Sequence, residues 1–293
     1  MDKLKKFKSS SIFLPLVALA ILVIFNIIFV PGFLDVEITQ DGRLYGRVFD
    51  ILNRSSSLII LSLGMTFVIA TAGIDISVGA VVAISGAVCC SLIGGRGDGV
   101  AEYPMIVAMI AAVAAGVICG MWNGFLVAKI KIQPMVVTLI LMVAGRGIAQ
   151  LLTEGQIITV YYAPFSYIGG NIPGNIIPSP IIIAILMIAL VVFILKKTSL
   201  GLFIQSVGIN PTASRYAGIN VALIIFLVCA FSGFCAGVSG LIESSLIRAA
   251  DANNAGLNME MDAILAVALG GTLLSGGKFY IGGSIIGAIT IQT

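Results

Sequence analysis

Apolar residues occur in long runs separated by short polar or glycine-rich breaks. A helix needs roughly 20 apolar residues to cross a hydrocarbon core about 30 Å thick. Since 59% of the 293 residues are hydrophobic and 10% are charged, the pattern predicts an all-α, polytopic membrane protein. Two of its runs, 78–93 and 262–274, are short for full spans, so each is either a tilted helix or part of a re-entrant pair. The nine predicted spans are residues 12–30, 51–72, 78–93, 105–128, 134–152, 178–195, 219–242, 262–274 and 280–293.

A basic segment, residues 1–11, precedes the first apolar run. This run is long for a secretory signal, and it ends through Phe29, Val30 and Pro31 without a small-x-small cleavage pattern. We therefore predict a retained first helix, a cytoplasmic N-terminus at residues 1–11, and one transmembrane domain over residues 12–293.

All nine lysines fall on one side when the chain is threaded from a cytoplasmic N-terminus. Among the thirteen acidic residues, only Asp2 and Asp75 lie on that side. Lysine and arginine concentrate at the cytoplasmic ends of spans, so the basic bias predicts this orientation. A net charge of +3 at helix ends does not require a nucleic-acid partner. The ten of sixteen basic residues placed inside are Lys3, Lys5, Lys6, Lys8, Lys129, Lys131, Lys196, Lys197, Arg215 and Lys278.

The side chains that usually carry catalysis are missing. There is no histidine, no cysteine pair at ligand spacing, and no serine beside a plausible base. The sequence GGTLLSGGK at 270–278 misses the phosphate-loop spacing by one residue, and Phe279 replaces the required Ser or Thr. We therefore predict neither an enzyme nor a metal site, and any ATPase must be another polypeptide. The five cysteines lie in apolar runs, where we expect small buried side chains: Cys89, Cys90, Cys119, Cys229 and Cys235.

Glycines recur four residues apart in three of the apolar runs. Small residues at this spacing let two helix backbones approach closely in a membrane. We therefore expect helix packing at each stripe. The stripes are Gly116, Gly120 and Gly124; Gly233 and Gly237; and Gly283 and Gly287.

One polar break carries an ionisable group between two apolar runs. Asp75 lies in the sequence AGIDISVG at 72–79, where glycines permit an unwound turn. Ser77 is placed to cap the following helix through its hydroxyl. Asp75 either faces a cavity or a partner group, or anchors this turn at the cytoplasmic surface.

Three ordered blocks resemble a known family. Residues 61–87, LSLGMTFVIATAGIDISVGAVVAISGA, closely resemble the signature of ribose-type permeases, the membrane subunits of ATP-binding-cassette importers for monosaccharides. Residues 201–221, GLFIQSVGINPTASRYAGINV, are similar to the loop by which such permeases contact their ATPase. Residues 232–277, including DAILAVALGGTLLSGG, resemble the family's later block. The sequence ADANNAG, which follows Arg248, resembles the branch of the family that transports galactofuranose and related sugars.

The resemblance covers the chain from about Asn53 onward and implies about ten spans. One further helix and a cytoplasmic tail are then expected beyond Thr293. The resemblance also implies an ATPase-coupling loop over residues 196–218. In this loop Asn210 can cap a short helix that has Pro211 at its first position. The coupling residues are expected to be Gly208, Asn210, Pro211, Arg215 and Tyr216, and the alternative is an ordinary solvated loop.

As a permease of this family, the chain would import a pentose or hexose, including furanose forms. The resemblance implies three partners: an extracytoplasmic binding protein, a cytoplasmic ATPase that holds ATP and Mg, and a second permease chain in a homodimer or heterodimer. No cofactor is expected on this chain, and the location is the bacterial plasma (inner) membrane. The alternatives are a permease for autoinducer-2 or nucleosides, an ATPase-independent secondary carrier, and a membrane scaffold.

A neutral polyhydroxylated solute calls for scattered hydrogen-bonding groups in the pathway rather than fixed charges. The alternative for the outer residues is interfacial loop polarity. A cluster of aromatic residues at 161–167 is either interfacial or a docking surface for a binding protein. The candidate pathway residues are Thr66, Asp75, Ser77, Asn253, Asn254, Glu260 and Asp262.

Overall fold

A computed structural model describes residues 13–35, 37–38, 44–94, 101–172 and 175–293. The predicted cytoplasmic segment 1–11 lies outside the described residues. The all-α prediction is confirmed, because helices build the bundle and the strands form two short antiparallel pairs. The helices are α2 (Phe13–Phe29), α3 (Arg47–Ala70), α4 (Val78–Ile93), α5 (Met105–Phe125), η1 (Leu126–Ile130), α6 (Pro134–Leu152), η2 (Ala163–Phe165), α7 (Ser166–Gly169), α8 (Ser179–Lys197), α9 (Leu200–Ile209), α10 (Pro211–Tyr216), α11 (Val221–Ile247), α12 (Met259–Leu269) and α13 (Ile281–Gln292).

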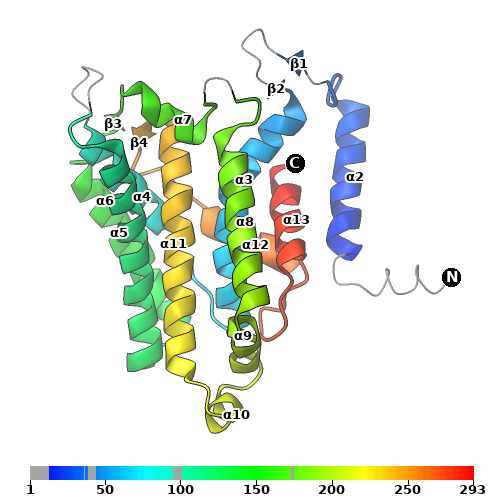
Figure 1. Ribbon diagram of the computed structural model, residues 1–293, viewed down its shortest axis with the longest axis vertical. Coiled ribbons are helices and arrows are strands. Elements are labelled where there is room, and N and C mark those ends of the chain that lie inside the picture. Colours follow the sequence, from blue (N-terminus) through cyan, green and yellow to red (C-terminus); the bar gives the residue numbers. More distant parts are fainter. Residues whose placement is uncertain (1–12, 36, 39–43, 95–100, 173–174) are drawn as a thin grey trace, which may run out of the picture.

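The two strand pairs lie near the same end of the bundle (Figure 1). Strands β1 (Glu37–Ile38) and β2 (Leu44–Tyr45) form the first pair. In the second pair, β3 (Ile158–Thr159) pairs with β4 (Ala249–Ala250), with Ile158 opposite Ala250. This second pair ties the segment after α6 to the chain that leaves α11.

Five helices in the described part of the chain are long and apolar enough to cross a membrane. They are α3, α5 continued through η1, α6, α8 and α11. Helix α11 extends beyond the predicted run 219–242 to Ile247, because polar residues of its last turns are buried and bonded. Ser244 donates to the carbonyl of Gly240, and Ser245 donates to that of Phe165.

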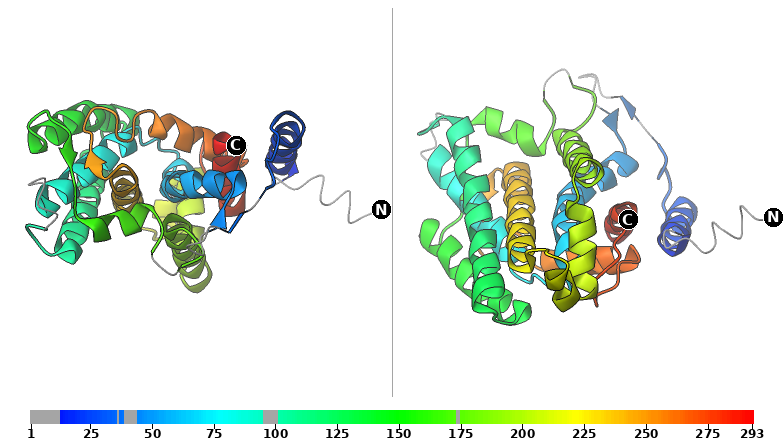
Figure 2. Two further views of the ribbon diagram at one scale, coloured as in Figure 1. Left: turned by 90° about the horizontal axis from the view of Figure 1, so that it is seen from above. Right: turned by 60° about the horizontal axis from the view of Figure 1, so that its bottom comes forward.

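The predicted run 262–274 does not form one span. Helix α12 has 11 residues, so it is about 16 Å long and cannot cross a 30 Å core. Seen from above, it lies across the bundle while α11 is viewed end-on (Figure 2, left). The chain then turns at Gly270 and rises as α13, which packs against α12. The structure thus favours the re-entrant alternative for this run.

Helix α11 runs through the middle of the bundle and packs on α3, α4 and α5 (Figure 1). Its glycine stripe meets that of α5. A Cβ at Gly116 would lie 2.5 Å from the carbonyl oxygen of Gly233, and a Cβ at Gly233 would lie 2.9 Å from Cα of Gly120. These two backbones can therefore touch only without side chains. A Cβ at Gly124 would lie 3.0 Å from Cα of Phe226, and one at Gly237 would lie 3.1 Å from Cα of Val113.

The third stripe packs α13 on α12. A Cβ at Gly283 or Gly287 would overlap the carbonyl oxygen of Gly270 or Ala266, respectively. Helix α2 stands at the edge of the bundle, where it packs on α13, and Asn26 donates to the carbonyl of Thr293 over 3.3 Å (Figure 1).

Candidate translocation site and coupling segment

Asp75 is the centre of a buried hydrogen-bond network in the break between α3 and α4. Its Oδ1 accepts from the backbone N–H of Ser77 at 3.0 Å and from the Ser77 hydroxyl at 2.6 Å. Its Oδ2 accepts from the Ser232 hydroxyl of α11 at 3.0 Å. Asn123 of α5 donates through Nδ2 to Ser77 Oγ at 2.9 Å. Asp75 thus joins the broken segment to α11, and Ser77 joins it to α5.

This burial decides between the two interpretations of Asp75. The residue is 4% exposed, so it does not anchor the turn at the surface. The predicted capping role of Ser77 is also wrong, because within the described residues its hydroxyl makes no capping hydrogen bond to α4. The hydroxyl donates to the Asp75 carboxylate, and its oxygen accepts from Asn123 Nδ2 rather than from a backbone N–H of α4.

Thr66 lies apart from this network. Its hydroxyl, buried within α3, is 2.6 Å from the carbonyl oxygen of Ser62 and 2.8 Å from Oγ of Ser284 on α13. The contact joins α3 to α13. Thr66 therefore has a packing partner and no exposed surface from which to bind a solute.

Asn253 and Asn254 lie on the segment that leaves α11, and both are exposed. Asp251 organises this turn: its Oδ1 accepts from the backbone N–H of both residues, at 3.0 and 3.1 Å, and its Oδ2 accepts from Asn254 Nδ2 at 2.7 Å. The hydrogen bond from the Asn254 side chain, more than any other cause, lowers the pKa of Asp251 below its ordinary value. Gln150 of α6 donates to Asn253 Oδ1 at 2.7 Å.

The same segment is held against α6 and α4. Arg146 donates through Nη1 to the carbonyls of Ala252, at 3.2 Å, and Ala255. A Cβ at Gly256 would lie 2.5 Å from the carbonyl oxygen of Gly79, so these two backbones are in close contact. We call residues 249–258 the return loop, because they lead from the end of α11 back to α12.

Glu260 and Asp262 begin α12, where carboxylates complement the positive end of the helix. Glu260 is 6% exposed, and its Oε2 has no hydrogen-bond partner among the described residues. A side chain at position 79 would overlap that oxygen, so Gly79 leaves the room that the carboxylate occupies. Asp262 is only half-buried. Together with Asn253 and Asn254, these groups offer donors and acceptors suited to hydroxyl groups.

Sequence reasoning did not single out several residues that complete these two sites. Four of them are polar residues inside runs that are otherwise apolar, and that contrast is the signal that could have found them, whereas Asp251 lies in the polar stretch between two runs. The added residues are Asn123, Arg146, Gln150, Ser232 and Asp251.

The predicted cap of α10 is confirmed. Asn210 Oδ1 accepts from the backbone N–H of Ala213 at 2.9 Å, and Pro211 occupies the first helical position. The short helix lies at the end of the bundle opposite the two strand pairs (Figure 1). Arg215 is exposed, and Tyr216 is 90% exposed. An exposed, rigidly capped helix is suited to contact another protein.

Gly208 links this exposed helix to the bundle. It is buried, and a Cβ there would overlap the carbonyl oxygen of Ala70 and lie 2.6 Å from the N of Gly277. The N–H of Gly277 itself donates to Ala70 O at 2.9 Å. The end of α3, the end of α9 and the 270–280 segment therefore meet at one backbone junction, which we call the Gly208 junction. Displacement of α10 and α9 would bear directly on α3.

Comparison with known proteins finds transport permeases among the relatives of the chain. The galactofuranose transporter permease protein YtfT of Escherichia coli is 47% identical over 279 residues, covering 94% of this chain and 79% of the relative. The fructose import permease protein FruF of Bifidobacterium longum is 39% identical, over 98% and 80%. The ribose import permease protein RbsC of Escherichia coli is 36% identical, over 84% and 75%.

No solved structure matches the chain. The sequence model of the family described as "Branched-chain amino acid transport system / permease component" matches residues 47–293. This match and the three relatives show that the chain belongs to this family of transport permease components.

Proposed function

We propose that the chain is the membrane-spanning permease subunit of an ATP-binding-cassette importer for a monosaccharide. The proposal rests mainly on the Gly208 junction and α10. There, an exposed, capped helix is joined by backbone contact to the buried helix α3. With this arrangement, a displacement of α10 would move α3 within the bundle. The similarity to permeases named for galactofuranose, fructose and ribose supports a sugar as the solute.

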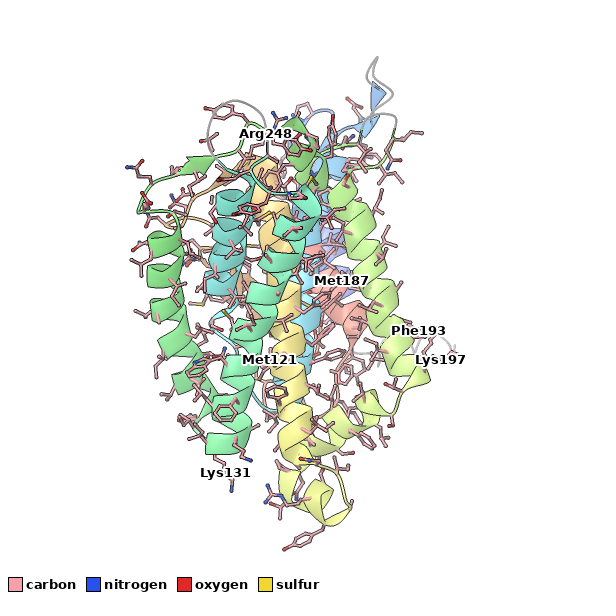
Figure 3. The ribbon with its side chains drawn as sticks, turned by 60° about the vertical axis from the view of Figure 1, so that its left-hand side comes forward. Met121, Lys131, Met187, Phe193, Lys197 and Arg248 are labelled. Carbon is pink, nitrogen blue, oxygen red and sulfur yellow. The ribbon has the colours of Figure 1, made fainter. Side chains whose placement is uncertain are left out.

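The proposed orientation places α10 and the N-terminus in the cytoplasm. Lys131 and Lys197 lie in the lower half of the view, with Lys131 nearer the end, while Arg248 lies at the top (Figure 3). The end that carries α10 also carries the lysine-rich loops, as expected for the cytoplasmic side. ATP and Mg would be held by a separate ATPase that contacts Arg215 and Tyr216, and this chain would need no cofactor.

The return loop is the proposed contact for the solute. Its exposed amides, Asn253 and Asn254, are held in place by Asp251 and Gln150, so little ordering is needed when a sugar binds. The pathway would be completed by a second permease chain and supplied by an extracytoplasmic binding protein. Because the 47% identical relative is named for galactofuranose, furanose sugars are the first to test.

The test is gentle affinity purification of the chain from its native membrane, followed by mass-spectrometric identification of the bound polypeptides. We expect a phosphate-loop ATPase to be recovered with the wild type and to be lost from the double variant Arg215→Ala/Tyr216→Ala. The matched control is Lys129→Ala, which removes a basic residue from the same end outside the coupling loop. Wild-type chain recovered without an ATPase, from a preparation that retains other intact importers, would refute the proposal.

A further inference from the structure

A cavity of about 200 Å³ lies between α3, α8, α9 and α11. All nine residues that line it are apolar, and they include Phe67, Leu195, Ile204 and Phe231. No side-chain hydroxyl, amide or charge faces it from this lining, so it cannot satisfy the hydroxyl groups of a sugar. Its ligand must be hydrocarbon. The cavity is therefore separate in chemistry from the return loop.

The cavity reaches the surface of the bundle. Leu227, one of the lining residues, is 43% exposed. The neighbouring surface of α8 is also apolar, with Leu186 65% exposed and Phe193 60% exposed. Phe193 lies beside the end of α8 that carries Lys197 (Figure 3). In a membrane protein, such a surface faces the acyl chains of lipids. An acyl chain can therefore enter the cavity from the side.

Two cationic side chains stand at the border of the cavity. Lys196 and Lys197 directly follow the lining residue Leu195 and end α8, and both are exposed. Within the described part of the chain, no carboxylate forms an ion pair with either ammonium group. The charges are therefore available to an anionic headgroup, and the cavity begins within one helical turn of them.

We propose that this cavity binds part of one acyl chain of an anionic phospholipid whose headgroup pairs with Lys196 and Lys197. The combination of a hydrocarbon-lined cavity and adjacent cations fits a lipid with one negative charge and long chains. Since α9 supplies Leu200 and Ile204 to the lining, the bound chain packs against the helix that ends in the Gly208 junction. The proposal requires only that α8 ends at a lipid surface, and it does not depend on the solute or the ATPase.

The test is native mass spectrometry of the purified full-length chain titrated with palmitoyl-oleoyl phosphatidylglycerol or with phosphatidylcholine of the same chains. We expect tighter retention of phosphatidylglycerol. The double variant Lys196→Gln/Lys197→Gln should weaken it roughly 25-fold, because each lysine near an anionic headgroup contributes about fivefold in affinity. The matched control, Lys129→Gln/Lys131→Gln, removes two exposed lysines at the same end without touching the cavity and should leave retention unchanged.

Binding of the acyl chain in the cavity is tested separately from binding of the headgroup. Leu227→Trp places a bulky ring at the mouth of the cavity and should reduce retention of both lipids, whereas Leu186→Trp on the exposed face of α8 should not. Phosphatidylglycerol with two four-carbon chains should bind weakly to the wild type. Equal retention of the two long-chain lipids, equal loss in the two lysine variants, or tight binding of the short-chain lipid would each overturn the proposal. Displacement of lipid from this face by a second copy of the protein would also overturn the proposal.

Discussion

Two polar segments interrupt the helical bundle, and they satisfy their polar groups in opposite ways. In the break between α3 and α4, Asp75 is buried and receives three hydrogen bonds from Ser77 and Ser232. In the return loop, Asn253 and Asn254 are exposed, and their supporting bonds leave amide groups at the surface. The polar groups of the first segment are buried and bonded within the protein, whereas those of the second reach the surface.

We expect the two segments to serve different purposes. A buried carboxylate surrounded by hydroxyl groups fixes the relative position of helices, because removing it leaves several donors without an acceptor. An exposed amide held by its neighbours costs little to maintain and can exchange water for a solute. We therefore expect substitutions in the first segment to change stability, and substitutions in the return loop to change transport.

The largest effect is expected for Asp75→Ala. This change removes the acceptor for Ser77 and Ser232 in a buried site, so we expect the free energy of unfolding to fall by about 2–3 kcal/mol. Denaturant unfolding in micelles measures it, and Ser232→Ala, which removes one bond, should cost about 1 kcal/mol. If Asp75→Ala unfolds like the wild type but no longer transports, Asp75 belongs to the pathway and the comparison fails.

The second prediction concerns Gly79, which follows the Asp75 break and contacts the return loop. At Gly79→Ala, the new methyl group would overlap Glu260 Oε2 and the carbonyl of Gly256, so α12 and the return loop must shift. We expect uptake to fall at least tenfold, with a stability loss of about 1–3 kcal/mol. Gly147→Ala is the matched control, because a Cβ there meets nothing within 4 Å and α6 should gain up to about 1 kcal/mol. Normal uptake by Gly79→Ala would show that the position of the return loop is not critical.

A third prediction concerns the support of the return loop. Arg146→Met keeps an apolar stem of similar length but removes the donors to Ala252 and Ala255. We expect uptake to fall about tenfold with a stability loss near 1 kcal/mol, because the loop loses its orientation. Uptake of labelled sugar into vesicles and unfolding in micelles measure the two effects. A stability loss without any change in uptake would assign Arg146 a purely structural role.

The smallest effects are expected at the exposed amides. Asn253→Ala and Asn254→Ala each remove a group that can bond a sugar hydroxyl, so we expect the KM for uptake to rise roughly tenfold with unfolding unchanged. Gln156→Ala is the matched control, because it removes an exposed amide outside the return loop. Unchanged KM in both variants would move the solute contact away from the return loop.

Sequence alone predicted the helical membrane architecture, the break at Asp75 and the cap of α10. These follow from local signals: apolar runs, glycines beside a carboxylate, and Asn210 followed by Pro211. The partners of Asp75 could not be predicted, since Ser232 is 157 residues away in sequence from the carboxylate that it contacts. The run 262–274 was predicted as a possible span because hydropathy does not record direction, and a helix lying across the bundle is as apolar as one crossing the membrane.

The Gly208 junction shows the same limit. The resemblance pointed to Gly208 as a coupling residue, but its physical reason is a backbone contact with Ala70 and Gly277, which no spacing in the sequence reveals. That contact also explains why exposure is a poor guide here. Tyr216 is exposed, whereas Gly208 is buried and, in the proposed function, would act only through its contact with α3.

The most direct test of the account is the energy source of transport. Uptake of labelled galactofuranose and ribose should be measured in cells that contain the native importer, after ATP depletion with the ion gradients clamped, and after collapse of the gradients with ATP maintained. We expect uptake to stop in the first condition and to continue in the second. Uptake that survives ATP depletion but stops when the gradients collapse would contradict it and identify a secondary carrier.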